Sequence, residues 1–345
     1  MSGGVTQLVA IGAQDAYIVG SPEVSFFRSS YKRHTNFAHV VSRQVIQGNP
    51  TPSNMTSVRF ERKGDLLSYV YLTRKENGAS VAFGANDIDH IDLLIGGQVV
   101  DSQDNFFATG ISDIMVSTQQ KANADGLSNK YYPIQFWFCQ NWQSALPMIA
   151  LQYHDVEMRI YWSSSLNLSA SPAFECWADF IYLDNDERQE FATKTHNILM
   201  YQVQKQSLSG TKIQNLVFNQ PVKFMAATSN IIYGSETESN TLLLQINGVD
   251  VGEPKNYSPH FTTVPIYYTV PWTINSPPGF LYSFCLDTSK LQPTGSLNFS
   301  RVDSARLVST ANFTADTSTG SQYIYAVNYN ILKIENGMGG LLYAN

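Results

Sequence analysis

Charged residues are scarce in this chain: Asp, Glu, Lys and Arg make up 14% of its 345 residues, against about 25% in typical soluble domains. There are only three cysteines, at positions 139, 176 and 285, and an odd, sparse set does not build a disulfide framework. A hydrophobic share of 43% excludes a disordered chain. We therefore expect a folded protein whose weakly charged surface is partly covered by neighbouring subunits.

The sequence also lacks long uninterrupted apolar runs. Residues 131–153 and 256–286 contain no Asp, Glu, Lys or Arg, but prolines and side-chain amides interrupt both stretches. Because burying those groups in lipid would be too costly, we expect no membrane span. The first twenty residues have no basic region followed by an apolar core, so we also expect no signal peptide.

The charge balance is acidic, with a net charge of −6, which argues against wholesale binding of nucleic acid. The distribution is uneven. Residues 26–75 hold nine Lys or Arg and two Asp or Glu, whereas residues 76–183 hold three Lys or Arg and twelve Asp or Glu. Two interpretations stay open. The basic segment faces an anionic neighbour, such as nucleic acid or lipid head groups, or its cations form ion pairs within or between subunits.

Short segments of alternating polarity dominate the chain. Every second residue of 156–162 is apolar, which is typical of a half-buried strand. Gly, Asn, Pro and Ser punctuate the gaps between such segments and indicate turns. The pattern predicts antiparallel β sandwiches or barrels, with further strands at 57–62, 67–73, 91–100, 134–139, 199–206, 241–251, 280–286 and 323–334.

One helix is expected near the middle of the chain, from Asp184 to about His196. Asp184 can cap its free N–H groups, and Glu187 stands three residues later, in capping-box position. The acidic first turn also favours the positive end of the helix dipole. We interpret this helix as the connector between two β domains.

An internal repeat supports the division into two domains. Three segments, 93–97, 136–139 and 153–156, recur in the same order and at nearly constant separation as 243–248, 282–285 and 301–304. Two copies of one β unit side by side account for this pattern. We predict an N-terminal arm at 1–25, a first domain at 26–183, a helical linker at 184–197 and a second domain at 198–345.

Motifs for catalysis and metal binding are weak. We find no Gly-x-Ser-x-Gly elbow, no phosphate loop and no His-x-x-His pattern. Asp155 and Glu157 form a same-face carboxylate pair of the kind a glycosidase uses, but nothing nearby marks a sugar cleft. We expect no enzyme activity, no cofactor and no metal, and we interpret as a solvated strand entry the one tight cluster of ligand-type side chains, Asp87, Asp89, His90 and Asp92.

Several motifs follow one another along the chain in an order typical of one protein family. Their residues are Arg33, His34, Thr35, Asn36, Phe37, Gly96, Gly97, Phe136, Trp137, Phe138, Leu146, Pro147, Asp184, Glu187, Arg188, Asn298, Phe299, Ser300, Arg301 and Asp303. These signature residues resemble those of the double jelly-roll major capsid proteins of nucleocytoplasmic large DNA viruses, of the iridovirus and phycodnavirus type. The resemblance covers residues 3–345, and residues 136–154 are its most specific stretch. The chain is short for this family, so we expect trimmed outer loops.

The resemblance implies an all-β chain of two tandem eight-stranded antiparallel jelly rolls joined by a short helix. It also implies a structural capsid protein that forms homotrimers. Each homotrimer is a pseudo-hexameric capsomer, and these capsomers tile an icosahedral shell. The expected partners are other copies of the chain, neighbouring capsomers, and minor capsid or cement proteins. The expected location is the virion capsid, assembled in the host cytoplasm.

Individual residues carry further expectations. Phe136 and Phe138 are expected on one face of a strand and Trp137 on the other, whereas Gly96 and Gly97 are expected in a hairpin turn. A basic cluster is expected to make an inward contact in the particle, without specific nucleic-acid recognition; it comprises Arg28, Lys32 and Arg33. Two alternatives stay open: a minor or paralogous double jelly-roll capsid protein, and a monomeric β-sandwich that binds carbohydrate.

Overall fold

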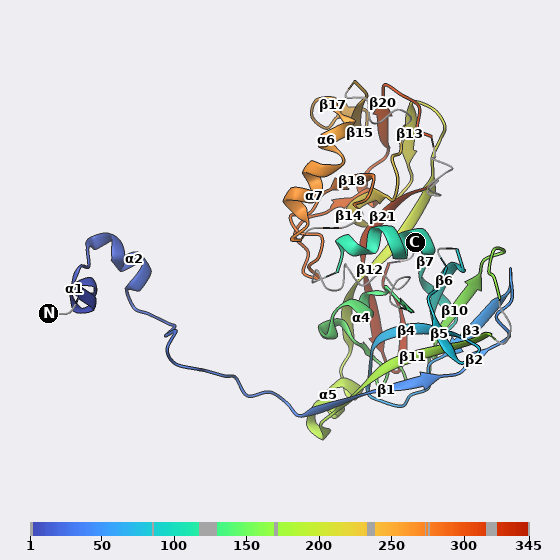
Figure 1. The fold of residues 1–345 in the computed structure, drawn as a ribbon, viewed down its shortest axis with the longest axis horizontal. Helices are drawn as coiled ribbons and strands as arrows, with labels where there is room; N and C mark the ends of the chain where they lie inside the picture. The colour runs from blue at the N-terminus through green and yellow to red at the C-terminus, as the bar shows by residue number, and fades with distance from the viewer. Residues whose placement is uncertain are drawn as a thin grey trace. The chain divides into compact units, whose positions relative to one another are not determined.

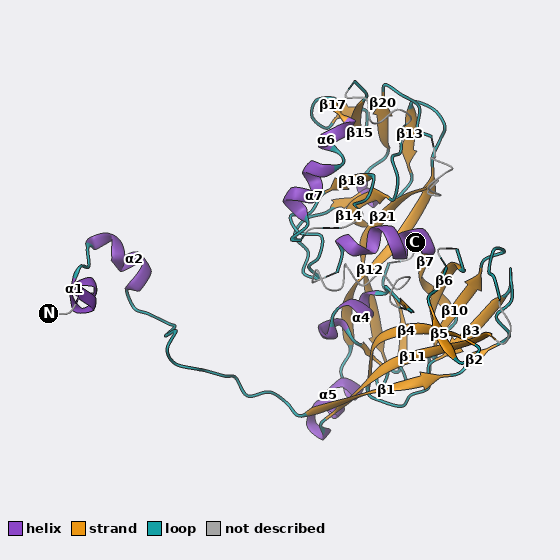
Figure 2. Ribbon diagram, in the orientation of Figure 1, coloured by secondary structure: helices purple, strands orange, loops and turns teal. Residues whose placement is uncertain are grey.

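The computed structural model describes residues 3–84, 86–116, 130–168, 172–232, 239–272, 274, 277–314 and 323–343. The chain separates into two compact units, Met1–Asn36 and Phe37–Asn345. Strands make up most of the regular structure, and the helices are short (Figure 2).

The first unit contains only short helical segments. They are α1 (Gly3–Val9), the 3₁₀ turn η1 (Ala13–Asp15) and α2 (Ala16–Val19). None of its described side chains is buried, and large apolar ones such as Leu8, Tyr17 and Phe27 are exposed. This segment has no hydrophobic core of its own.

Residues 37–183 form the first β sandwich. One antiparallel sheet has the order β1-β11-β4-β5, with β8 and β9 also paired to β4, and the other has the order β2-β3-β10-β6-β7. The strands are β1 (Phe37–Gln44), β2 (Ile46–Gln47), β3 (Met55–Arg59), β4 (Leu66–Glu76), β5 (Ala79–Val81), β6 (Ile88–Ile95), β7 (Gln98–Asp104), β8 (Tyr131–Pro133), β9 (Leu146–Pro147), β10 (Val156–Trp162) and β11 (Pro172–Leu183).

The second β sandwich follows α5 (Asn185–Thr193). One sheet has the order β12-β21-β14-β18, with β19 on β14 and β22 on β21, and the other has the order β13-β20-β15-β16, with β17 on β15. The strands are β12 (His196–Ser207), β13 (Ile213–Leu216), β14 (Pro221–Ala227), β15 (Thr241–Ile246), β16 (Val249–Asp250), β17 (Lys255–Asn256), β18 (Phe280–Ser283), β19 (Leu297–Asn298), β20 (Ala305–Ser309), β21 (Tyr323–Glu335) and β22 (Met338–Leu341).

The same strand order occurs in both sandwiches. In each, the first strand pairs with the last long strand, which pairs with a third: β1-β11-β4 corresponds to β12-β21-β14, and β3-β10-β6-β7 to β13-β20-β15-β16. In Figure 1 the blue-to-green strands β3, β10 and β6 gather in one part of this unit and β13, β15 and β20 in another. No described strand pairs across the two sets of sheets.

Two of the three sequence repeats occupy equivalent places. The β6–β7 turn at Gly96 and Gly97 and the β15–β16 turn at Asn247 and Gly248 all have positive φ angles, between 51° and 82°, as tight two-residue hairpins require. In both turns a backbone N–H donates to the carbonyl just before the neighbouring strand, from Gly96 to Asp155 (3.0 Å) and from Asn247 to Ser304 (2.8 Å). The predicted hairpin at Gly96 and Gly97 is therefore confirmed.

The third repeat differs in structure, and the strand expected at 134–139 was wrong. Residues Trp137–Gln140 form a helical turn, α4, whereas the matching segment extends from β18. Phe136, Trp137 and Phe138 are all buried, so they do not divide between two strand faces. A helical turn projects consecutive side chains in different directions into surrounding core, which a flat strand cannot do.

The remaining helical segments are short. They are the π-helical turn η2 (Phe107–Ile111), the 3₁₀ turns η3 (Ser112–Ile114), η4 (Trp142–Ser144) and η5 (Phe299–Arg301), and the helices α6 (Tyr257–His260) and α7 (Thr263–Thr269). The predicted central helix is present as α5, but it ends at Thr193 and β12 begins at His196. Within the described residues, no helix is long and apolar enough to cross a membrane.

Apolar side chains fill each sandwich and continue between them. In β10 the burial alternates with strict period two, as the sequence predicts. One cluster of buried side chains runs from the first sandwich, including Trp137 and Met158, to Tyr201, Phe224 and Val327 of the second. A further cluster around Phe280 lies within the second sandwich alone. The two sandwiches thus share part of their core.

Candidate functional site

The contact between the two sandwiches, which we call the seam, contains buried polar groups that link distant parts of the chain, among them Asp101, Asp104 and Gln202. Its central elements are β7 and β12. Asp101 on β7 accepts hydrogen bonds from the backbone N–H of Val203 on β12 (3.0 Å) and from Nε2 of Gln103 (2.7 Å). Gln202 on β12 donates from Nε2 to the carbonyl of Val100 (2.5 Å). These bonds fix the register of the two sandwiches against each other.

Burial changes the acidity of Asp101. The side chain is 3% exposed, and burial raises its pKa to about 7, although the bonds from Val203 and Gln103 act in the opposite direction. Desolvation disfavours the ionised carboxylate. The seam therefore contains a carboxyl group that changes charge near neutral pH.

Asp104, three residues further on, joins the same two strands to β21. It accepts from the hydroxyl of Tyr325 (2.7 Å) and from Nζ of Lys205 (3.3 Å) through Oδ2, while Oδ1 accepts from the N–H of Phe107 (2.9 Å). This carboxylate is thereby compensated by a cation and by two further donors.

At another point of the seam, His154 bridges the β6–β7 turn and β22. Its Nδ1 lies 2.9 Å from the carbonyl and 3.2 Å from the N–H of Gly339. A Cβ built on Gly96 would lie 2.3 Å from the same nitrogen. The N–H of Tyr153 donates to the carbonyl of Gly337 (2.9 Å) beside it. Glycine at position 96 therefore allows the first sandwich to approach the C-terminal hairpin.

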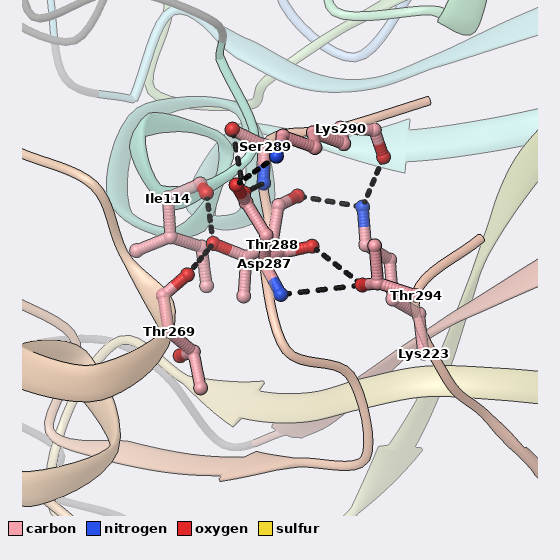
Figure 3. A network of polar contacts seen from close by, with 8 residues as sticks. All are labelled: Ile114, Lys223, Thr269, Asp287, Thr288, Ser289, Lys290 and Thr294. Atoms are coloured by element: carbon pink, nitrogen blue, oxygen red, sulfur yellow. Dashed lines mark hydrogen bonds and ion pairs between the residues drawn. The ribbon is translucent and has the colours of Figure 1, made fainter. Parts of the chain in front are cut away.

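A loop at residues 287–294 forms a third polar connection (Figure 3). The hydroxyl of Thr288 donates to the carbonyl of Ile114 in the first sandwich (2.6 Å). The same hydroxyl lies 3.3 Å from the carbonyl oxygen of Thr269. Lys223 on β14 donates from Nζ to the carbonyls of Thr288 (2.6 Å) and Lys290 (3.0 Å). The lysine thus holds the loop that contacts the first sandwich.

The structure places most of the predicted signature residues in structural positions. Leu146 and Pro147 are buried in β9, and Phe299 is buried in η5. Asn298 caps η5 by accepting from the N–H of Ser300 (3.0 Å), and Ser300 Oγ accepts from the N–H of Gln220 (2.8 Å). Arg301 and Asp303 are exposed.

The signature around α5 forms a local network with a distant carboxylate. Asp184 accepts from the N–H of Asn185 (2.8 Å) and stands at the N-cap, as predicted. Arg188 pairs through Nε with Asp65 (3.0 Å), whose other oxygen accepts from the N–H of Leu183 (2.9 Å). Glu187 Oε2 is buried without a recorded partner in the described structure, so its predicted reach back to the N-cap is not observed.

The N-terminal signature lies at the end of the first unit and the start of β1. Arg33, His34, Thr35 and Asn36 are exposed outside regular structure, and Phe37 opens β1.

Ion pairs account for six of the nine basic residues in 26–75. Arg43 and Lys75 pair with Glu175 at 3.6 and 3.0 Å, and Arg59 and Arg62 pair with Asp155 at 2.5 and 3.8 Å. The other two are Lys63, paired with Glu61, and Arg74, paired with Glu76 and Asp87. The remaining three of these nine, Arg28, Lys32 and Arg33, are exposed and have no recorded ion pair in the described part of the chain.

The candidate chemical clusters of the sequence are occupied by structural contacts. Asp87 accepts from Arg74 (2.7 Å), and the ring of His90 stacks on Tyr161 at 4.1 Å. Glu157 pairs with Arg159 (2.9 Å), and the other carboxylate of the same-face pair, Asp155, pairs with Arg59 and Arg62. Among the residues that the structure describes, no group of three or more His, Cys, Asp or Glu side chains is arranged to hold a metal ion.

Sequence reasoning missed two groups of the seam, Asp101 and Lys223. Both are nearly fully buried and stand in strands whose other positions are largely apolar or amide. A signal existed for Lys223, because Val222, Phe224 and Met225 surround it with apolar neighbours on both strand faces. For Asp101 the polar sequence of β7 gave no such contrast.

The fold defines a class: two β sandwiches of one strand order, in tandem, are the architecture of double jelly-roll viral capsid proteins. The solved PBCV-1 virus capsid matches with a TM-score of 0.77 and 28% identity, over 93% of this chain and 100% of that one. The Faustovirus major capsid protein shares the fold, with a TM-score of 0.63 at 11% identity over 91% of this chain and 93% of that one.

Sequence comparison identifies the family. Residues 25–201 match the family described as "Major capsid protein N-terminus", and residues 237–340 match "Large eukaryotic DNA virus major capsid protein". The major capsid protein of Paramecium bursaria Chlorella virus 1 is 32% identical across the full length of both chains, and that of Pyramimonas orientalis virus is 30% identical, also across both. The chain belongs to the family of large eukaryotic DNA virus major capsid proteins, and its role is structural, in the virion capsid.

Proposed function

We propose that three copies of this chain form a pseudo-hexameric capsomer that tiles an icosahedral shell. The observation that carries the proposal is the repeated strand order: two similar sandwiches per chain give six similar outlines around a threefold axis. Such a unit approximates a hexagon, the shape that tiles the faces of an icosahedral shell. Exposed apolar side chains, including Tyr267 and Tyr268 on α7, supply surface suited to subunit contacts.

The mass of the purified protein in solution tests the trimer. The chain weighs 38.5 kDa, so a trimer weighs 115.5 kDa. Size-exclusion chromatography with light scattering should give the trimer mass, because obligate interfaces of about 2,000 Å² or more do not dissociate readily. A stable 38.5 kDa species at all concentrations would contradict the proposal.

Copy number separates a major shell protein from the minor or paralogous double jelly-roll alternative. We propose that this chain is the abundant one, a role that agrees with the names of its full-length relatives. Quantitative mass spectrometry of purified particles tests this. Electron microscopy of sections of infected host cells tests the proposed assembly in the host cytoplasm, because it shows where the shells form.

The proposed domain boundaries are an arm at 1–25, jelly rolls at 26–183 and 198–345, and a linker at 184–197. The separation of sheets between residues 37–183 and 196–341 supports them. The signature residues are proposed to maintain the fold without catalytic, cofactor or metal roles. The ion pairing of Asp155 and Glu157 agrees with a non-enzymatic protein.

The exposed cations Arg28, Lys32 and Arg33 are proposed to contact minor capsid or cement proteins on the inner side of the shell. Their lack of ion pairs in the described structure supports this role. Reversal of all three charges should reduce co-assembly with internal particle proteins, whereas reversal of the exposed Lys212 and Lys255 serves as the control. Unchanged particle composition in the triple variant would contradict the contact.

A further inference from the structure

Lys223 is a buried cation without an acidic partner. Its side chain is on β14, and the residue is 4% exposed. Two of its three N–H hydrogens are used by the carbonyls of Thr288 and Lys290 (Figure 3), so one remains. Among the described residues no carboxylate comes within ion-pair distance of its Nζ. The nearby Asp287 pairs with Lys290 instead, at 3.5 Å.

The charge of Lys223 is consequently poorly compensated. Burial lowers its pKa to about 8, and Cys285 and Asp287 oppose this only in part. The ammonium is still mainly protonated at neutral pH. Buried charges in proteins are ordinarily paired, because an uncompensated one is costly.

Two more buried donors near Lys223 lack hydrogen-bond partners in the described structure. They are Nε1 of Trp137 and the hydroxyl of Tyr329, in residues that are 1% and 6% exposed. Nζ of Lys223 lies 5.9 Å from the centroid of the Tyr329 ring. An indole N–H can only donate, and each unpaired buried donor costs about 1–3 kcal/mol.

All three side chains line one cavity of about 30 Å³ between the sandwiches. That volume suits one small species of the size of a water molecule or a halide ion. Two other polar groups at its wall are already engaged: Ser144 Oγ donates to the carbonyl of Trp137 (2.9 Å), and the Tyr201 hydroxyl donates to the carbonyl of Gln135 (3.1 Å). No described carboxylate lines the cavity.

We propose that this cavity binds a small monovalent anion of the size of chloride, which accepts hydrogen bonds from Lys223, Trp137 and Tyr329. A positive charge and two neutral donors favour an anion over a cation, and charge-assisted bonds favour it over water. Trp137 belongs to the first sandwich and the other two residues to the second, so the anion strengthens the seam. The site does not depend on the trimer.

Thermal unfolding in different anions tests the site. Chloride should raise the melting temperature by about 2–4 °C relative to gluconate at equal ionic strength and pH 7, because a ligand that binds only the folded state stabilises it and gluconate is too large for the cavity. Crystals soaked in bromide should give an anomalous peak beside Lys223 Nζ.

Variants separate this site from general salt effects. Lys223→Met should abolish the difference between chloride and gluconate, and Tyr329→Phe, which keeps the ring, should raise the half-saturating chloride concentration about tenfold. Tyr282→Phe is the control, because Tyr282 is a half-buried tyrosine outside the cavity. The proposal is overturned if the wild-type melting temperature is the same in chloride and gluconate and no bromide peak appears, which is the result expected for a bound water. It is also overturned if Lys223→Met keeps the full difference in melting temperature between the two anions.

Discussion

Gly96 is held in place by two separate constraints, its backbone conformation and its packing. Its φ angle is +59°, and a Cβ would lie 2.3 Å from His154 Nδ1. We expect Gly96→Ala to lower the free energy of unfolding by about 2–5 kcal/mol, since the left-handed region costs about 1–2 kcal/mol and overpacking about 1–3 kcal/mol. Chemical denaturation measures the loss.

Gly97→Ala is the matched control. Its φ angle is +82°, but no atom lies within 4 Å of an added Cβ, so it should lose only the conformational part, about 1–2 kcal/mol. Equal losses at the two positions would mean that the approach of His154 imposes no packing requirement.

Asp101 should make stability depend on pH. Its folded pKa of about 7 exceeds the ordinary 3.8, so the folded state binds the proton more tightly than the unfolded state. The stabilisation that Asp101 protonation adds to the folded state is fully present below pH 3.8 and is lost as the pH rises toward 7. Above pH 7 this group causes no further change in the free energy of unfolding. Acidification within that window therefore favours the folded seam as far as this group is concerned.

Replacing Asp101 with Asn should remove this pH dependence while leaving an acceptor for the N–H of Val203. The difference in unfolding free energy between wild type and Asp101→Asn should change by up to about 4 kcal/mol between pH 4 and 7, at about 1.4 kcal/mol per pH unit. Denaturation series across that range measure it, with the exposed Asp303→Asn as control. A constant difference would show that Asp101 is ionised throughout.

At the scale of elements, α4 depends on Trp137, which is 1% exposed and packs edge-on against Phe138 at 5.1 Å. Trp137→Ala should lower the free energy of unfolding by about 3–5 kcal/mol through loss of buried contacts and cavity formation. Trp142→Ala, five residues later and 77% exposed, should change it by less than about 0.5 kcal/mol. Similar melting curves for the two variants would contradict the burial of Trp137.

Elements with a regular period were predictable, and those shaped by distant contacts were not. Strand β10 follows period two because one face meets the core, and Asp184 caps α5 through a purely local contact. Residues 136–138 look like a strand in sequence, yet burial from several sides favours a helical turn. Gln202 meets Val100 across 102 positions, and no local pattern encodes such a pairing. The contacts of the seam could therefore not be predicted from the sequence.

At the scale of the whole molecule, residues 1–36 should be dispensable for folding of the two sandwiches. They form a separate unit with no described buried side chain. We expect a chain of residues 37–345 to melt within about 2 °C of the full chain, because less than about 1 kcal/mol of stability is removed. Calorimetry of both proteins checks this, and a large drop would reveal a stabilising contact by the arm.

The apolar cluster that runs through both sandwiches also determines how the chain responds to bending. A rotation of one sandwich against the other would expose apolar side chains to water and break the hydrogen bonds between β7 and β12. The two sandwiches of each chain should therefore move as one rigid body. In a curved shell built from such chains, the change of angle would have to occur at the interfaces between chains. Mechanical deformation of the shell should therefore occur first at those interfaces.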